Sequence, residues 1–247
     1  GRRIPAQDGV TAFPPTRGSV IAAAASGEPE IRARALETLA AAYWRPVYAY
    51  IRMRHGKSHE EASDLTQELF ARLVEKGWLL RFDPAKARLR TYLRVCVDGL
   101  VANEEKAARR EKRGGGVAIL SLDVAASRDE LELALSAGGT PEQAFEKQWV
   151  KSVFALALER FRAEARASGK TLGAALFSAY DLGEEEPRPS YADLAARHGT
   201  TAVDVTNKLA AARRDFRRAV LDVLRELTAN ESELRLEARA LLGIELP

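Results

Sequence analysis

Apolar side chains recur at spacings of three and four residues along almost the whole chain of 247 residues. This spacing places them on one face of an α-helix, whereas a half-buried β-strand needs strict alternation. Only residues 117–122 alternate in the manner of a strand. We therefore expect an all-α protein in which each helix buries one apolar stripe.

Several helix ends can be located from capping residues. Ser58 is followed three residues later by Glu61, which predicts a capping box at the start of a helix. Thr140 precedes Pro141, and a capping threonine with proline at the first helical position predicts another start. Glycines end two of the predicted helices, at Gly77 and at 114–116.

These boundaries divide the chain into four parts. Residues 1–18 contain three prolines and little pattern, and we expect them to form a flexible tail. Residues 19–115 form a first helical domain, 116–139 an acidic and apolar-poor linker, and 140–247 a second helical domain. The prediction is thus two helical domains joined by a linker.

The net charge of +3 conceals an uneven distribution. Residues 1–115 carry 21 basic and 14 acidic side chains, residues 116–189 carry 8 and 12, and residues 190–247 carry 9 and 9. The segment 81–113 alone holds ten basic and five acidic residues. Either a polyanion binds this segment, or its charges form intrahelical ion pairs on a solvated helix.

Several function classes are disfavoured. The sequence has no Walker loop, no nucleophile elbow and no glycine-rich dinucleotide motif, so we expect no enzymatic activity and no cofactor. One cysteine, Cys96, and three histidines do not make a usual zinc site, although His55 and His59 lie four residues apart. The uncharged stretch 20–27, like every other uncharged stretch of the chain, is too short for a membrane span. We expect a cytoplasmic protein without a metal or a membrane partner.

Residues 190–218 have the pattern of a helix-turn-helix unit. Gly199 suits the tight turn. The apolar residues are Tyr191, Leu194 and Ala195 on the first helix and Val203, Val205, Leu209 and Ala212 on the second, where Val205 and Leu209 have the spacing that closes the core. In such units the second helix enters the DNA major groove with its N-terminal residues on base edges. The groove-facing candidates are Thr200, Thr201, Asp204 and Lys208, and the phosphate-contacting candidates are Arg213 and Arg214. A helical hairpin that binds no DNA is the alternative.

The motifs together resemble bacterial RNA polymerase sigma factors of the extracytoplasmic-function type, within the sigma-70 family. The first part carries YWRPVYAYIR at 43–52, DLTQELFARL at 64–73, LRTYL at 89–93, and ANE at 102–104 leading to KRGG at 112–115. The second carries SYADLA at 190–195, VTNKL at 205–209 and ARRDFR at 212–217. These blocks follow the order of the family and span residues 19–243.

The resemblance implies a factor that binds core RNA polymerase and directs promoter-specific initiation. It implies that the helix over 64–76 contacts the polymerase clamp, with Asp64, Gln67, Glu68 and Arg72 as its polar contacts. It implies that 81–113 binds and melts the −10 promoter element, through Arg88, Arg90, Tyr92, Arg94, Asn103, Lys106, Arg109, Arg110 and Arg113. Trp78 and Phe82 either stack on unpaired bases or belong to the core. The helix-turn-helix would read the −35 element.

Some positions depart from the family pattern. Asp98-Gly99 stands where Arg-Asn is common, and Ala210 and Ala211 follow Leu209 where the family has cationic residues. Fewer cations on the second helix imply weaker or altered DNA reading. The alternative is therefore a sigma-derived regulator, binding DNA or protein, with reduced or lost promoter recognition.

Beyond the helix-turn-helix, residues 231–242 predict a further amphipathic helix. Its leucines, Leu234, Leu236, Leu241 and Leu242, either pack on the second domain or serve docking. An anti-sigma factor or another regulator is a candidate partner there, and autoinhibitory docking is the other option.

Overall fold

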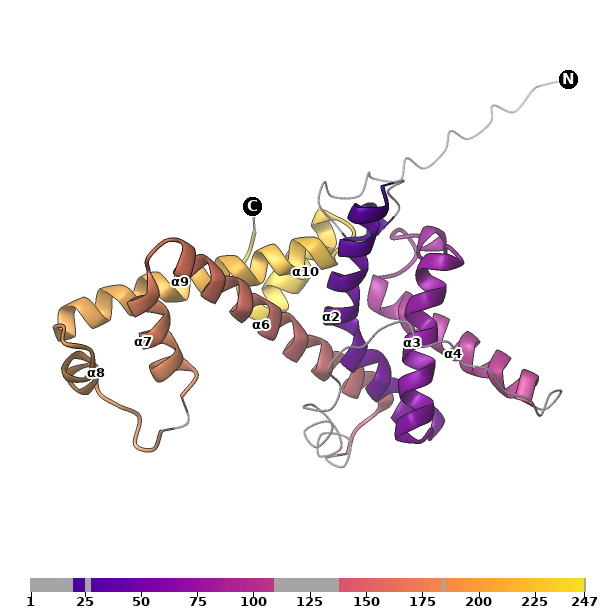
Figure 1. Cartoon of the computed structure of the whole chain (residues 1–247), viewed down its shortest axis with the longest axis horizontal. Helices are drawn as coiled ribbons and strands as arrows, with labels where there is room; N and C mark the ends of the chain where they lie inside the picture. Colours follow the sequence, from indigo (N-terminus) through magenta and orange to yellow (C-terminus); the bar gives the residue numbers. More distant parts are fainter. Residues whose placement is uncertain (1–19, 25–27, 109–137, 184, 247) are drawn as a thin grey trace, which may run out of the picture.

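The structure is a computed structural model that describes residues 20–24, 28–108, 138–183 and 185–246 (Figure 1). All regular secondary structure in these ranges is helical, and none of the described residues lies in a strand. The prediction of an all-α protein is confirmed. The strand-like segment 117–122 and the glycines at 114–116 lie outside the described residues.

The N-terminal helices surround one central helix, α2 (Pro29–His55). The others are α1 (Val20–Ala24), α3 (His59–Glu75), the short 3-10 helix η1 (Leu79–Arg81) and α4 (Leu89–Ala108). α2 runs through Pro46 as one helix and buries apolar residues on several sides. Its Trp44 stacks on Phe70 of α3 with ring centroids 6.0 Å apart. α3 and α4 thus cover one side of α2, as Figure 1 shows.

The predicted capping residues form local hydrogen bonds. The Ser58 hydroxyl accepts from the Glu61 amide, and the Glu61 carboxylate accepts from the Ser58 amide. Thr140 forms the equivalent box with Gln143, followed by Pro141 in the first helical position. Both capping predictions are therefore confirmed, because each depends only on residues three apart in the sequence.

The C-terminal helices are α6 (Pro141–Ala167), α7 (Thr171–Asp181), α8 (Tyr191–His198), α9 (Ala202–Leu227) and α10 (Glu231–Leu242). α6 and α9 are long and lie side by side, and α7 packs on α9. Four phenylalanines, Phe154, Phe161, Phe177 and Phe216, join these three helices with ring centroids 5.0–6.2 Å apart. This aromatic cluster fixes α7 at the end of the α6–α9 pair that lies far from α2 (Figure 1).

α6 also packs along the side of α2 that α3 and α4 leave open. Phe145 of α6 is fully buried between Tyr43 and Tyr50 of α2, with ring centroids 6.4 Å and 6.2 Å away. The helices on either side of residues 109–137 therefore share an apolar contact. The division into two domains remains a prediction.

Candidate functional site

The amphipathic helix α3 has one apolar and one polar side. Leu69, Phe70 and Leu73 are buried against the rest of the N-terminal helices. Asp64 lies on the exposed side and forms no hydrogen bond or ion pair with the residues described. Gln67 is half-buried beside it. The predicted polymerase-binding helix thus presents an unpaired carboxylate to solvent.

Glu68 and Arg72, the other two predicted polymerase contacts, belong to a network that links α3 to α4. The Arg72 guanidinium donates to Glu68 at 2.6 Å and to Glu104 of α4 at 3.3 Å. It also lies 5.7 Å from the ring centroid of Trp78. Arg72 is therefore held in place by two acids and one aromatic ring, and it joins two helices as well as facing outward.

Arg90 is the most enclosed of the predicted DNA-binding residues that the structure describes. Only 6% of it is exposed. Its guanidinium donates to Glu237 of α10 at 2.7 Å, forms an ion pair with Glu146 of α6 at 3.2 Å, and lies 3.9 Å from the ring centroid of Trp149. Burial acts to lower the pKa of Arg90, but Glu237 and Glu146 together outweigh it and raise that pKa. Arg90 therefore stays charged, and acids of the C-terminal helices pair with its charge.

Arg88 binds the same carboxylate. Its guanidinium donates to Glu237 Oε1 at 3.0 Å, while 45% of its side chain stays exposed. The Glu237 side chain is only 5% exposed. The local sequence pattern does not indicate Glu237 as a partner of Arg88, because the two residues lie 149 positions apart.

The other described residues of α4 differ in their exposure. Tyr92 is half-buried: its hydroxyl donates to the Trp78 carbonyl, and its ring lies 5.4 Å from that of Phe82, which is buried. Arg94 is half-buried and lies 5.6 Å from the Phe145 ring centroid. Asn103 and Lys106 are exposed. Arg109, Arg110 and Arg113 lie outside the described residues.

Asp98, the acid that departs from the family pattern, has a structural contact. It accepts hydrogen bonds from Tyr50 at 3.3 Å and pairs with His55 Nε2 at 3.0 Å, both near the end of α2. His59 instead pairs with Tyr48 at 2.7 Å. The two histidines therefore have separate partners, and no group of three or more potential metal ligands occurs among the described residues.

α8 and α9 are joined by a tight turn at the position that the sequence predicts. Ser190 and Asp193 form a capping box at the start of α8, and Gly199 ends it with a φ of 61°. Thr201 then caps α9 by accepting from the Asp204 amide at 3.1 Å. This local geometry brings Thr200, Thr201, Asp204 and Lys208 together at the N-terminal end of α9.

The polar residues of that end bind one another. The Thr200 hydroxyl donates to Asp204 at 2.6 Å, and Lys208 pairs with the same carboxylate at 3.4 Å. The Thr200 hydrogen bond, with Lys208, lowers the pKa of Asp204. Further along, Arg213 forms a two-pronged pair with Asp181 of α7, while Arg214 is exposed. Two of the predicted cationic contacts are thus already paired.

Val203, an apolar residue of the predicted second helix, lies in the first turn of α9 and is 71% exposed, whereas Val205 is fully buried. An apolar side chain therefore stands among the polar ones at the helix start.

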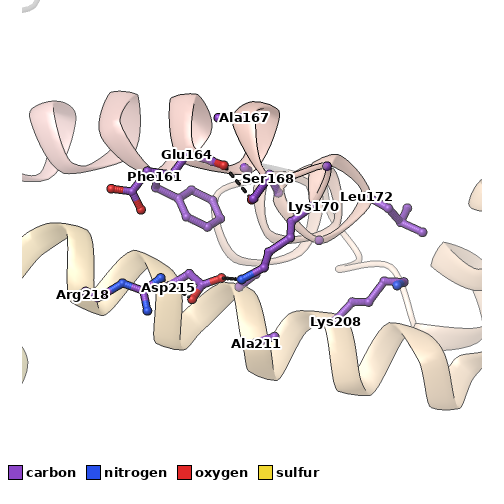
Figure 2. Close-up of a pocket in the computed structure, with 15 residues that line it drawn as sticks. Phe161, Glu164, Ala167, Ser168, Lys170, Leu172, Lys208, Ala211, Asp215 and Arg218 are labelled. Atoms are coloured by element: carbon purple, nitrogen blue, oxygen red, sulfur yellow. Dashed lines mark hydrogen bonds and ion pairs between the residues drawn. The ribbon is translucent and has the colours of Figure 1, made fainter.

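An open groove of about 590 Å³ lies where α6, α7 and α9 meet (Figure 2). Lys170 and Asp215 form an ion pair of 3.0 Å beside it, and Lys208 lies on its edge. Among the sequence-predicted site residues, only Lys208 lines it.

Within the described ranges, no helix has the length and apolar character needed to cross a membrane.

Comparison with known proteins gives one match. Residues 39–113 match the family model of sigma-70 region 2. No curated protein and no solved structure matches the chain. The matched range contains most of α2, all of α3 and all of α4, and so includes the polar face of α3 and the basic start of α4. Residues 39–113 are therefore similar to sigma-70 region 2, and this similarity supports a sigma factor of the sigma-70 family.

Proposed function

We propose that this chain is an extracytoplasmic-function sigma factor that binds core RNA polymerase and directs initiation at specific promoters. The observation that carries the proposal is the sigma-70 region 2 match over residues 39–113. That region supplies polymerase binding and −10 recognition in this family. The motifs of the C-terminal helices, in family order, support the extracytoplasmic-function subtype.

The polymerase contact is assigned to the outer face of α3. A helix can bury one side in its own domain and offer the other to a partner. The exposed and unpaired Asp64, with Gln67 next to it, fits this role best. Glu68 and Arg72 complete the surface, and the ion pairs of Arg72 with Glu68 and Glu104 keep it ordered before the partner arrives.

Promoter melting is assigned to α4 and the loop before it. Unpaired bases stack on aromatic rings, while cationic side chains hold the backbone phosphates. Asn103 and Lys106 are exposed and available for such contacts. Arg88, Arg94 and the basic residues of 109–113 would add phosphate contacts.

Reading of the −35 element is assigned to the start of α9. The turn at Gly199 and the cap at Thr201 are compatible with a helix-turn-helix, whose second helix presents its first residues to base edges. Thr200, Thr201, Asp204 and Lys208 are then the base-facing set, and Arg214 is an available phosphate contact.

Transcription in vitro tests the proposal. Purified chain is added to core polymerase with a library of promoter fragments, and transcripts above the core background identify the promoters used. Asp64→Ala should lower core affinity by at least tenfold without changing stability, while Glu75→Ala, an exposed acid on the same helix, should leave it unchanged. A chain with no measurable affinity for core polymerase would exclude the proposal.

A second function is favoured by one observation. Lys208 and Arg213 are paired with Asp204 and Asp181, which leaves the start of α9 with few free cations. This supports a sigma-derived regulator that binds polymerase, DNA or another protein with reduced promoter recognition. It predicts core binding without promoter-dependent transcripts in the same assay.

A further inference from the structure

One buried carboxylate binds two predicted phosphate-binding arginines. Glu237 of α10 accepts from Arg88 at 3.0 Å and from Arg90 at 2.7 Å, both at Oε1. A carboxylate that takes two guanidinium groups offers the same charge-assisted contacts as a nucleic-acid phosphate. The Glu237 carboxylate and a nucleic-acid phosphate therefore compete for the same donors of Arg88 and Arg90.

The C-terminal helices also close the surface around Arg90. Glu146 and Trp149 of α6 hold the guanidinium from the side, and the Trp149 ring lies 3.9 Å beneath it. Both Arg90 and Glu237 are buried. A phosphate cannot reach Arg90 until α10 moves away from α4.

The buried acids of α10 are stabilised by these arginines. Glu233 lies one turn before Glu237 and is also buried. Two buried acids on one helix face repel each other unless cations compensate them. The contact between α4 and α10 therefore depends on the pairing of these acids with arginines. Leu234 on the same helix is buried by apolar packing instead.

We propose that α10 masks the promoter-facing arginines of the sigma-70 region 2 domain, with Glu237 in the place of a backbone phosphate. The free chain is then held in a closed form with weakened nucleic-acid binding. Displacement of α10 exposes Arg88 and Arg90 and restores their phosphate contacts. The inference rests on the proposed function in one respect, namely that Arg88 and Arg90 bind nucleic acid.

The test compares full-length variants binding a fluorescent 30-base-pair duplex of arbitrary sequence over a range of salt concentrations. Glu237→Gln keeps the shape and removes the charge. We expect it to bind about three- to tenfold more tightly than the unchanged chain, with a salt slope steeper by about one to two units, since each phosphate contact contributes about 0.9 on a duplex.

Glu226→Gln is the matched control. Glu226 forms a two-pronged pair with Arg160 at 2.8 Å and 2.9 Å, within the C-terminal helices and away from α4. It loses the same charge and should change DNA affinity by less than twofold. Equal gains in both variants, or no gain in Glu237→Gln, would overturn the proposal.

The combination of Glu237→Gln with Arg88→Ala and Arg90→Ala attributes the gain to the two arginines. It should return the affinity and the salt slope to those of the unchanged chain or below. A gain that survives in this triple variant would mean that α10 masks something else, and the assignment to Arg88 and Arg90 would be wrong.

A second measurement uses the unchanged chain, in case Glu237→Gln folds poorly. The emission of Trp149 is obtained as the difference between the chain and Trp149→Phe. Saturation with the duplex should shift this emission to longer wavelength, because Arg90, which lies 3.9 Å from the ring centroid, leaves the ring to bind phosphate. DNA binding at full occupancy with an unshifted Trp149 would also contradict the proposal.

These results are independent of the sigma-factor assignment. Failure to bind core polymerase, with a DNA gain in Glu237→Gln, would remove the proposed function and leave the masking intact. Core binding and transcription, with no DNA gain in Glu237→Gln, would support the proposed function and exclude the masking.

Discussion

Arg90 and Glu237 lie 147 positions apart in the sequence and form a buried ion pair of 2.7 Å between α4 and α10. The pair joins the matched sigma-70 region to the last helix of the chain. A buried pair of this kind has an energetic consequence that differs from that of a surface pair, because neither partner can turn to water when the other is removed.

Arg90→Ala should therefore destabilise the protein strongly. Loss of one partner leaves Glu237 buried with only the half-exposed Arg88, and breaking a buried pair costs about 3 kcal/mol or more. Urea unfolding followed by circular dichroism measures the change. Arg197→Ala breaks the exposed pair with Glu185 and should destabilise the protein much less, because solvent screens an exposed pair. Similar losses in both variants would mean that Arg90 contributes no more than a surface residue.

Gly199 and Gly99 should respond to alanine in opposite ways. Gly199 has a φ of 61° at the turn between α8 and α9, and a side chain there costs about 1 kcal/mol. Gly99 lies inside α4 with no heavy atom near an added Cβ, so alanine should stabilise by about 0.5–1 kcal/mol. Thermal unfolding of the two variants checks the signs, and a stabilised Gly199→Ala would contradict the turn.

Val203 and Val205 test the orientation of α9. Val203→Ala should change the unfolding free energy by less than about 0.5 kcal/mol, because its side chain is exposed. Val205→Ala removes fully buried methyl groups and should cost about 2 kcal/mol. Chemical denaturation separates the two effects. If α9 reads DNA, Val203→Ala should also weaken binding at a site with thymine, whose methyl group accepts apolar contacts. Equal destabilisation by the two substitutions would reverse the assignment.

Cys96 should react slowly with alkylating reagents. Burial raises the pKa of its thiol, although the Tyr92 hydroxyl acts in the opposite direction. The thiolate is the reactive form, so the rate of iodoacetamide modification should rise with pH to a midpoint above the ordinary value of 9.0. The same reaction in urea gives the unfolded reference. A folded thiol that reacts as fast as the unfolded one at pH 8 would contradict this environment.

Glu233 should make stability depend on pH. Burial raises the pKa of its carboxyl above the ordinary value of 4.5, and the nearby Glu237 adds to this. The folded chain thus binds the proton more tightly than the unfolded chain, so this contribution to stability is lost as pH rises through and above 4.5. Glu233→Gln should gain stability relative to the unchanged chain between pH 4.5 and pH 7. Glu231→Gln, at an exposed position of the same helix, provides the control, and an equal gain there would argue against burial as the cause.

The features that could be predicted from the sequence are those set by near neighbours. Capping at Ser58 and Thr140 depends on residues three positions away, and the turn at Gly199 depends on the one residue that tolerates its φ. The apolar period likewise determines that a segment is helical. It does not determine which helix a face meets.

The contacts of the charged residues could not be predicted in this way. The charge count offered the segment of Arg88 and Arg90 either a polyanion or intrahelical ion pairs, and neither option names Glu237, which is their neighbour only in the packed fold. Asp98 looked unfavourable beside DNA until the structure placed it against His55 and Tyr50. Long-range pairing of polar groups depends on tertiary packing, which local spacing does not encode.

α9 is one uninterrupted helix of 26 residues, with Thr201 at one end and the connection to α10 at the other. At 1.5 Å per residue it is about 39 Å long, and it acts as a stiff lever. A tilt of about 10° that lifts α10 from α4 would move the opposite end by about 7 Å on that length. If that tilt uncovers the two arginines, it also re-aims the first turn of α9, which is the segment proposed to read the −35 element.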